Sequence, residues 1–385
     1  MSSMKRTARG LMGSAVLGGC LAVPAALHAT TVEHVNAKLN VQLISDQHTA
    51  VEGGYVSVHI LYHNVSNKKM DKAWLKLKLS GKLEVDGAVA AGALWDAAAG
   101  ALKWQLNDVA SGAAGVVHVN LKVKSGVTVG EQLELVCEGD DDAGGSVVTK
   151  PVPVKIGTGL HQPAFNGYPD GGFHPGGELT RAETAAIVSR LEGLEEAPGG
   201  ASVYSDVTAS HWAADDVGKV TKAGWMTGGG DGRFRPDAPI TRGEFAVLLL
   251  RMRGIEAVPL PGFDDDADNL NGDGNGNGGN GKHWAKDAIG TGKALGYLAG
   301  DAKGWFKANS AIRRDEAAKL LALALARGEL TDGQTKVLQH WPDVPRSAWS
   351  FGWVEELSLV AHESRDVGFR KEELIRYAPE LTQRF

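Results

Sequence analysis

Two patterns of hydrophobic and polar positions divide the chain. From residue 31 to 157, apolar and polar residues alternate in short runs that are bounded by glycine, proline and asparagine. Such alternation is typical of half-buried β-strands. After residue 158 the apolar positions recur at helical spacing, which predicts amphipathic helices. The sequence therefore predicts an all-β region followed by a mainly α-helical region.

The clearest strand of the first region runs from Trp74 to Leu79, where leucines alternate with lysines. The same alternation predicts strands at 56–62, 102–106, 117–123 and 133–137. Cys137 falls on the inner side of its strand. Pro151 and Pro153 predict that the last strand lies at an edge, because proline cannot donate to a ladder. About seven short strands in residues 31–157 predict an antiparallel, immunoglobulin-like sandwich.

One phrase returns three times in the helical region. It reads Thr180-Arg181-Ala182-Glu183, then Thr241-Arg242-Gly243-Glu244, and finally Arg313-Arg314-Asp315-Glu316. A glycine-rich turn with Phe or Trp precedes each copy, and His-Trp-Ala at 211–213 and 283–285 opens a second helix. Because Thr followed three residues later by Glu forms a capping box, several of these residues are predicted caps. They are Thr180, Glu183, Thr241, Glu244 and Glu316.

These phrases resemble the S-layer homology (SLH) repeat, whose pattern runs F-x-D-V, H-W-A, G-Y-x-D-G-x-F-x-P and I-T-R-A-E. The resemblance implies a pseudo-three-fold trimer of helix-loop-helix units, since no single unit buries its apolar stripe alone. The units are predicted at 158–202, 203–256 and 257–328, with a terminal half-repeat at 339–375 that completes the array. The β-region is loosely similar to the extracellular repeat DUF11 through 51–54, 62–64 and 104–106.

The arginine of each repeated phrase stands in the first turn of a predicted helix. A cation there opposes the helix macrodipole, at a cost of about 0.3–1 kcal/mol when exposed. An anion bound between the guanidinium and free helix amides explains Arg181, Arg242 and Arg314, and solvated surface arginines are the alternative. The resemblance implies which anion: a secondary cell-wall polysaccharide of Gram-positive bacteria, usually carrying a pyruvate ketal. Trp212 and Trp284 are further candidates for sugar contact, with packing into the core as the alternative.

The third copy departs from the pattern. Arg313 replaces the capping Thr, and Lys303-Gly304-Trp305 replaces the Asp-Gly turn. The capping box is therefore expected to fail there, and the third site is the weakest match.

An insertion at 265–282 separates the second and third copies. Its carboxylates and amides are ligands that Ca²⁺ prefers. The candidate ligands are Asp264, Asp266, Asp268 and Asp273. No Glu stands at the twelfth position of such a loop, and glycine-rich runs are typical of solvated linkers. A linker is therefore favoured, and no cofactor is expected.

The first residues predict export. Lys5, Arg6 and Arg9 precede a short apolar run, and residues 1–29 are interpreted as a signal peptide. A lipid anchor at Cys20 is the alternative. No other apolar run is long enough to span a membrane, so none is predicted in the mature form.

Composition and motifs narrow the function. The formal net charge of −6 argues against nucleic acid as a partner. The chain has no nucleophile elbow, paired-histidine metal motif or phosphate loop, which argues against an enzyme. The favoured function is a secreted surface protein, held non-covalently at the Gram-positive wall by its repeats and displaying the sandwich. Other surface-layer proteins are a second class of partner.

Two alternatives remain open. One is a carbohydrate-binding or adhesin module in the sandwich, where Trp74 and Trp95 are candidate contacts, although packing is the simpler role for both. The other is a wall hydrolase with a carboxylate pair.

Overall fold

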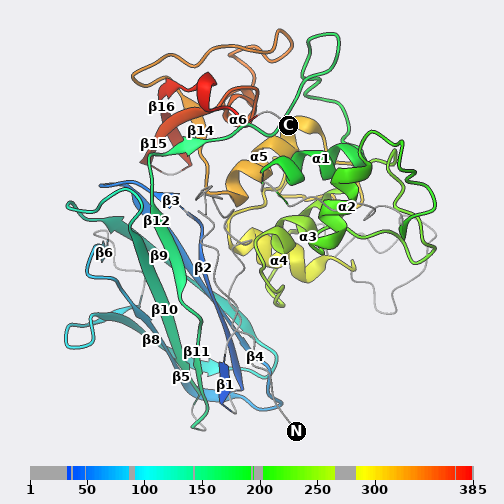
Figure 1. Cartoon of the computed structure of the whole chain (residues 1–385). Coiled ribbons are helices and arrows are strands. Elements are labelled where there is room, and N and C mark those ends of the chain that lie inside the picture. The colour runs from blue at the N-terminus through cyan, green and yellow to red at the C-terminus, as the bar shows by residue number, and fades with distance from the viewer. Residues whose placement is uncertain are drawn as a thin grey trace, which may run out of the picture.

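The computed structural model describes most of the chain after the predicted signal peptide. The described residues are 33–35, 38–47, 49–85, 92–141, 144–191, 194, 203–264, 283–368 and 370–383. The predicted signal peptide, Cys20 and three calcium candidates (Asp266, Asp268 and Asp273) lie outside them. Figure 1 shows two parts, a strand-rich part below and a helical part above it.

The strand-rich part is a sandwich of two sheets. One sheet has the order β2-β4-β9-β6, and the other the order β1-β11-β10-β5-β8-β7, in which β12 also pairs with β10 and β3 pairs with β12. The strands are β1 Glu33–Val35, β2 Leu39–Ser45, β3 Thr49–Ala50, β4 Tyr55–Asn64, β5 Met70–Lys78, β6 Leu83–Val85, β7 Leu94–Asp96, β8 Ala101–Val109, β9 Ala114–Val123, β10 Gln132–Asp140, β11 Ser146–Val148 and β12 Val152–Ile156. The predicted all-β sandwich is confirmed, and β4, β5, β8, β9 and β10 contain the predicted alternating runs.

The core of the sandwich is apolar. Leu75 and Leu77 of β5 and Cys137 of β10 are fully buried, on the faces that the alternation indicated. Burial raises the pKa of the Cys137 thiol to about 12. Among the described strands, β12 pairs with β10 along 152–155, and only its last two residues pair with β3 on the other side. The prolines thus stand where the ladder is one-sided, as their missing N–H requires.

The helical part has three pairs of packed helices. Helices α1 Arg181–Leu191, α3 Arg242–Met252 and α5 Arg314–Ala324 begin in the repeated phrase, and α2 Ala214–Lys222, α4 Lys286–Ala294 and α6 Phe351–Glu356 follow the His-Trp-Ala phrase or its terminal remnant. The pairs are α1 with α2, α3 with α4 and α5 with α6. Each helix of the repeated phrase therefore packs on the first helix of the next unit.

Three backbone hydrogen bonds close the array into a ring. The Leu179 N–H donates to Ile312 O at 3.0 Å, the Ile312 N–H donates to Ile240 O at 3.0 Å, and the Ile240 N–H donates to Leu179 O at 2.9 Å. All three residues are buried. Each stands two residues before its helix, so these bonds bring the N-termini of α1, α3 and α5 together. The first and third units meet as closely as units that are neighbours in sequence.

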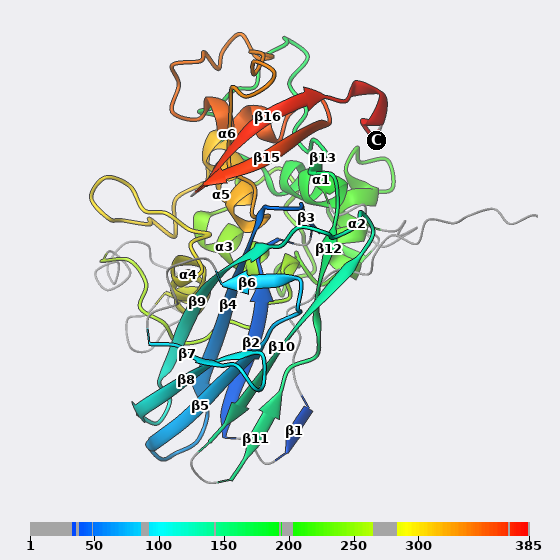
Figure 2. The same cartoon turned by 90° about the vertical axis from the view of Figure 1, so that its left-hand side faces the viewer.

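A small sheet completes the C-terminal end. Its order is β13-β15-β16-β14, with β13 Leu160–His161, β14 Glu329–Thr331, β15 His362–Gly368 and β16 Lys371–Tyr377, before the 3-10 helix η3 Pro379–Leu381. Sequence analysis did not predict these strands, and it placed the residues of β13 in the first repeat unit. Figure 2 shows β15 and β16 above the end of the sandwich, with β13 beside them. The segment that leaves the sandwich is therefore paired with the end of the chain.

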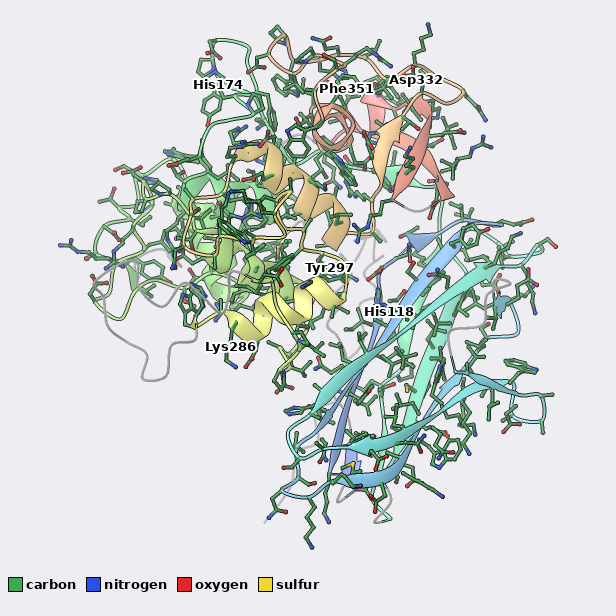
Figure 3. The ribbon with its side chains drawn as sticks, turned by 180° about the vertical axis from the view of Figure 1, so that it is seen from behind. His118, His174, Lys286, Tyr297, Asp332 and Phe351 are labelled. Atoms are coloured by element: carbon green, nitrogen blue, oxygen red, sulfur yellow. The ribbon has the colours of Figure 1, made fainter. Side chains whose placement is uncertain are left out.

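The sandwich is docked on the array. Gln42 exchanges two hydrogen bonds with the backbone of Glu256, at 2.8 and 3.0 Å. The Arg253 guanidinium donates to Ser45 O at 2.6 Å, and the Tyr297 hydroxyl donates to Asp46 at 2.8 Å. Ile44 and Leu61 of the sandwich pack in the hydrophobic cluster of the array. Figure 3 shows Tyr297 and His118 on the two sides of this junction.

Among the described residues, no helix has the length and apolar character needed to cross a membrane.

Candidate functional site

The glycine-rich turns of the three units share one backbone geometry. Gly171, Gly232 and Gly304 have φ of 83°, 73° and 78° at equivalent positions. The third residue after each glycine also has positive φ, 58° in all three turns, although none of the three is a glycine. They are His174, Arg235 and Lys307. The altered third turn therefore keeps the shape of the other two.

Two aspartates hold these turns from the neighbouring segment. The carboxylate of Asp206 accepts from the Phe234 and Arg235 N–H groups, both at 2.8 Å. Asp343 accepts in the same way from Phe173 and His174, at 2.9 and 2.7 Å. Asp343 of the terminal half-repeat therefore holds the first turn in the same way as Asp206 holds the second turn.

Each repeated arginine reaches the turn of another unit. Arg181 donates to Phe234 O at 2.8 Å and to Thr227 O at 2.7 Å. The equivalent bonds are Arg242 to Phe306 O at 2.6 Å and to Ala299 O at 3.3 Å, and Arg314 to Phe173 O at 2.8 Å and to Asn166 O at 2.9 Å. Each guanidinium also lies over the aromatic ring of that turn, 4.7–4.8 Å from its centroid. The arginines form a cycle of clamps around the ring.

The capping glutamate of the next unit completes each clamp. The guanidinium-to-carboxylate distance is 2.9 Å from Arg181 to Glu244, 3.1 Å from Arg242 to Glu316 and 3.8 Å from Arg314 to Glu183. Burial lowers the pKa of Arg181, and the charge of Glu244 partly offsets this effect. The arginines are largely enclosed, because their side chains are 11%, 9% and 4% exposed.

The helix caps differ between copies. The Glu183 and Glu244 carboxylates accept from the Thr180 and Thr241 N–H groups, and each threonine hydroxyl accepts in return. In the third copy only half of the box fails. Glu316 still accepts from the Arg313 N–H at 3.1 Å, whereas its own N–H donates to Asp315 at 2.8 Å.

One expectation about the arginines is wrong. Sequence analysis placed an anion between the guanidinium and free helix amides, but the amides at the helix starts already have acceptors. The Arg181 N–H donates to Ala238 O and the Ala182 N–H to Pro236 O, both at 2.9 Å. Equivalent bonds hold the first two amides of α3 and α5. Carbonyl oxygens and glutamates of the next unit therefore balance the cation.

The sites are shared between units. A pocket of about 210 Å³ lies at the first turn, and it joins Arg314, Tyr168 and Trp212 from three different units. Its other lining residues are Asn166, Gly167, Glu183, Ala186, Ile187 and Arg190. We call it the first groove. The arginine of the divergent third copy thus lies beside the turn of the first copy. A copy that matches the repeat pattern poorly can therefore contribute to the site at a copy that matches it well.

Tryptophans stand at the rims, where sequence analysis left their role open. Trp212 is 62% exposed and Trp284 is 64% exposed, so neither packs into the core. Trp349, which precedes α6, is 50% exposed and takes the third equivalent position. It was missed as a candidate because only Trp341-Pro342-Asp343-Val344 survives around it.

The remaining candidates are Asp264 and two tryptophans of the sandwich. Asp264 is exposed beside the undescribed insertion. In the sandwich, Trp74 is half-buried with the Lys103 ammonium 4.0 Å from its ring centroid, and Trp95 is 55% exposed. Packing therefore accounts for Trp74 but not for Trp95.

Comparison with known proteins identifies the repeats. The S-layer homology domain model matches residues 164–185, 203–246 and 280–318. Cell surface glycoprotein 1 of Acetivibrio thermocellus is 39% identical over 222 residues, covering 54% of this chain and 9% of that protein. The cellulosome-anchoring protein of the same species is 34% identical over 210 residues, covering 53% of this chain and 44% of that protein. This chain therefore contains S-layer homology repeats, and it spans less than half the length of either relative.

Among solved structures, a type I cohesin from Pseudobacteroides cellulosolvens matches with 22% identity and a TM-score of 0.21. The match covers 31% of this chain and 86% of the cohesin.

Proposed function

We propose that the repeat array binds an anionic secondary polysaccharide of the cell wall and so retains the protein at the surface without covalent attachment. The first groove is the observation that carries this proposal. It combines an exposed indole, which is a suitable platform for a sugar ring, with two arginines at its wall, which suit a carboxylate such as a pyruvate ketal. The arginine clamps hold the groove in shape before ligand arrives.

Within the first groove, Arg190 makes weaker hydrogen bonds to the backbone than Arg314 does. The Arg314 guanidinium has two short hydrogen bonds to carbonyl oxygens, whereas the hydrogen bond from Arg190 Nη1 to Ala164 O is 3.4 Å long. Burial lowers the pKa of both arginines, since each is taken out of water. We therefore assign the anion to the side of the groove that Arg190 and Arg314 share. The Trp212 indole at the rim takes the apolar face of the sugar.

The positions that line the first groove recur in the other two units, and we infer a second and a third groove there that are not chemically equal to it. The second has Arg181, Arg251 and Trp284, and glycine replaces the tyrosine of the first groove. The third has Arg242 and Trp349, but Leu323 stands where the other two have Arg190 and Arg251, and Asp301 replaces the tyrosine. Affinity should therefore fall from the first groove to the third. Grooves that act together still give firm retention, because the first attachment raises the effective concentration of the others.

The proposal makes the protein an anchor with a displayed sandwich and assigns it no catalysis. One relative is named as a cell surface glycoprotein and another as a cellulosome-anchoring protein, which supports this role. A second candidate, glycan binding by the sandwich, is favoured only by the exposed Trp95. One exposed tryptophan without a groove supports glycan binding less strongly than the three exposed tryptophans at equivalent positions of the array.

Co-sedimentation with purified, protein-free wall sacculi tests the proposal. We expect Trp212→Ala and Arg190→Gln to weaken pelleting and the triple change at Trp212, Trp284 and Trp349 to abolish it. Trp95→Ala is the matched control, because Trp95 is similarly exposed on the sandwich, and it should pellet like the wild type. Pelleting that survives the triple change and fails in Trp95→Ala would assign binding to the sandwich instead.

A further inference from the structure

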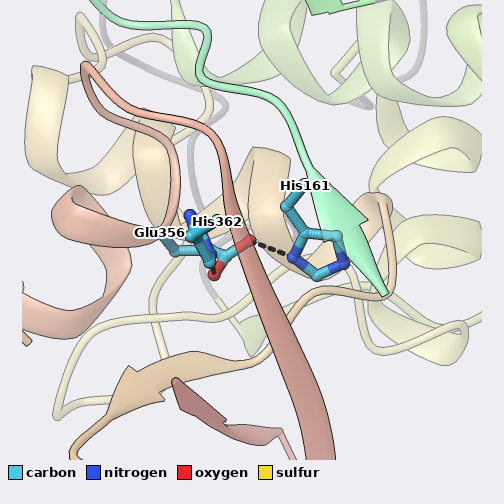
Figure 4. Close-up of side chains that lie close together, drawn as sticks. All are labelled: His161, Glu356 and His362. Carbon is cyan, nitrogen blue, oxygen red and sulfur yellow. Dashed lines mark hydrogen bonds and ion pairs between the residues drawn. The ribbon is translucent and has the colours of Figure 1, made fainter. Parts of the chain in front are cut away.

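Four ionisable side chains converge where the segment leaving the sandwich meets the end of the chain. His161 comes from β13, Glu356 from the end of α6, His362 from β15 and Glu372 from β16. His161 and His362 are directly paired in the β13–β15 ladder, which sets their rings side by side. Figure 4 shows both imidazoles directed at the carboxylate of Glu356.

The distances describe a compact set of nitrogen and oxygen donors. His161 Nδ1 lies 2.7 Å from Glu356 Oε1, and His362 Nε2 lies 2.8 Å from Glu356 Oε2. Glu372 Oε2 is 3.4 Å from the same nitrogen of His161. One ligand atom from each of His161, Glu356 and His362 lies within 4.8 Å of the other two.

The set is unusual for its burial. The side chains of Glu356 and His362 are 0% and 1% exposed, and that of Glu372 is 7% exposed. Two carboxyls and two imidazoles in one enclosed place are costly unless a partner satisfies them together.

A neighbouring pair shows what an ordinary buried ion pair needs. His340 Nδ1 lies 2.5 Å from the buried Glu355 carboxylate, with one imidazole for one carboxylate. The cluster at Glu356 doubles both groups and brings them from four elements. The Arg327 guanidinium, 3.8 Å from Glu356, already supplies a positive charge. Charge balance alone therefore does not account for the second histidine.

The donors fit a zinc-class ion. Imidazole nitrogens and carboxylate oxygens bind such ions at about 2.0–2.2 Å, which places tetrahedral ligands about 3.3 Å apart. Three of the donor pairs are 2.7 to 3.4 Å apart, and the donor atoms of His161, Glu356 and His362 all lie within 4.8 Å of one another, so modest side-chain shifts reach that spacing. The outer contacts are also those of a metal site. His362 Nδ1 faces Val360 O at 3.4 Å, and the Gly328 N–H and the Ser364 hydroxyl both donate to Glu372.

We propose that His161, Glu356, His362 and Glu372 bind one divalent transition-metal ion of the zinc class. The His161 side chain is 20% exposed, which leaves an entry path. The ion would link β13, which follows the sandwich, to α6, β15 and β16. It would thereby join the two ends of the array. This site does not depend on the grooves or on their ligand.

The test uses the untagged full chain after chelation and dialysis. Titration with Co²⁺ should give one equivalent with the visible absorption of a tetrahedral nitrogen and oxygen site, and Zn²⁺ should displace it. His161→Gln and His362→Gln should each abolish this equivalent. Ser364→Ala should weaken it by about 10–100-fold, as removal of an outer hydrogen bond does. His340→Gln is the matched control and should bind like the wild type.

Thermal unfolding supplies a second readout. Zn²⁺ should raise the Tm of the wild type and of His340→Gln but not of His161→Gln, which is the less buried histidine and so the milder change. Far-ultraviolet circular dichroism checks that each variant is folded. Absence of a stoichiometric equivalent in the wild type would overturn the proposal. So would an equivalent that persists in folded His161→Gln and His362→Gln chains.

Discussion

The sandwich and the repeat array are held together by different means. In the sandwich, neighbouring strands are joined by hydrogen-bonded ladders, and the core is made of buried apolar side chains such as Leu75 and Leu77. The array also has an apolar core, and backbone hydrogen bonds tie its units together. In addition, three largely buried arginines reach carbonyl oxygens of another unit, across 46 to 148 residues of sequence. The sandwich therefore depends on strand ladders and apolar packing, whereas the array adds charged contacts between its units.

The largest expected effect comes from breaking one clamp. Arg314→Ala removes the donors to Phe173 O and Asn166 O and leaves the Glu183 carboxylate without its cation. Loss of one partner of a buried pair costs about 3–5 kcal/mol, and here Phe173 O loses its donor while Glu183 keeps only its bonds from Tyr168 and Thr180. Hydrogen exchange should show faster opening of α1 and α5, with little change in β4 and β9.

Arg365→Ala is the control for the clamp. Arg365 is 54% exposed and pairs with Glu373 at the surface, so its loss should cost less than about 1 kcal/mol. Equal losses of unfolding free energy in the two variants would contradict the role given to the arginine clamps.

The same comparison can be made from the side of the sandwich. Leu75→Ala opens a cavity in the sandwich core and should cost about 2–5 kcal/mol of unfolding free energy. Protection from hydrogen exchange should fall in β5, β8 and β10 and persist in α3 and α5. Simultaneous loss of protection in both parts would show that docking joins them into one cooperative unit.

The junction between the two parts should depend on pH. Burial would raise the pKa of Asp46, but its contacts with His59, Arg253 and Tyr297 lower it below its ordinary value of 3.8. A lowered pKa in the folded protein means that Asp46 stabilises the fold above pH about 4 and loses this contribution as pH falls through the folded pKa.

Asp46→Asn should therefore cost about 1.5–3 kcal/mol near neutral pH, the worth of a charge-assisted hydrogen bond. The difference from wild type should shrink as the pH is lowered below 4. Urea unfolding at a series of pH values measures it, and a difference that stays constant with pH would contradict this role of Asp46.

The smallest expected effect concerns a helix cap of the array. Thr241→Ala removes the hydroxyl that accepts from the Glu244 N–H and should cost about 1 kcal/mol. Thr208→Ala, at an exposed position outside any helix, should be neutral in the same urea titration. A neutral Thr241→Ala would mean that the inter-unit bonds alone fix the start of α3.

Local patterns predicted much of this molecule. Leucine and lysine alternation predicted β5, and the repeated phrase predicted the starts of α1, α3 and α5. The C-terminal sheet was missed because the buried positions at the start of β15 are His362 and Ser364, which give no apolar alternation. The partners of the arginines could not be predicted, since they depend on which units meet when the ring closes. The exposure of Trp212 was equally undecidable, because a tryptophan at a helix start suits a core or a rim.

The most direct measurement of the central claim changes the wall and leaves the protein intact. Wild-type protein would be sedimented with sacculi before and after mild acid treatment that removes acid-labile ketals and glycan. The account predicts that pelleting is lost after treatment and that added salt weakens it beforehand, because the grooves bind a carboxylate. Undiminished pelleting on treated sacculi would contradict anchoring through an anionic wall polysaccharide.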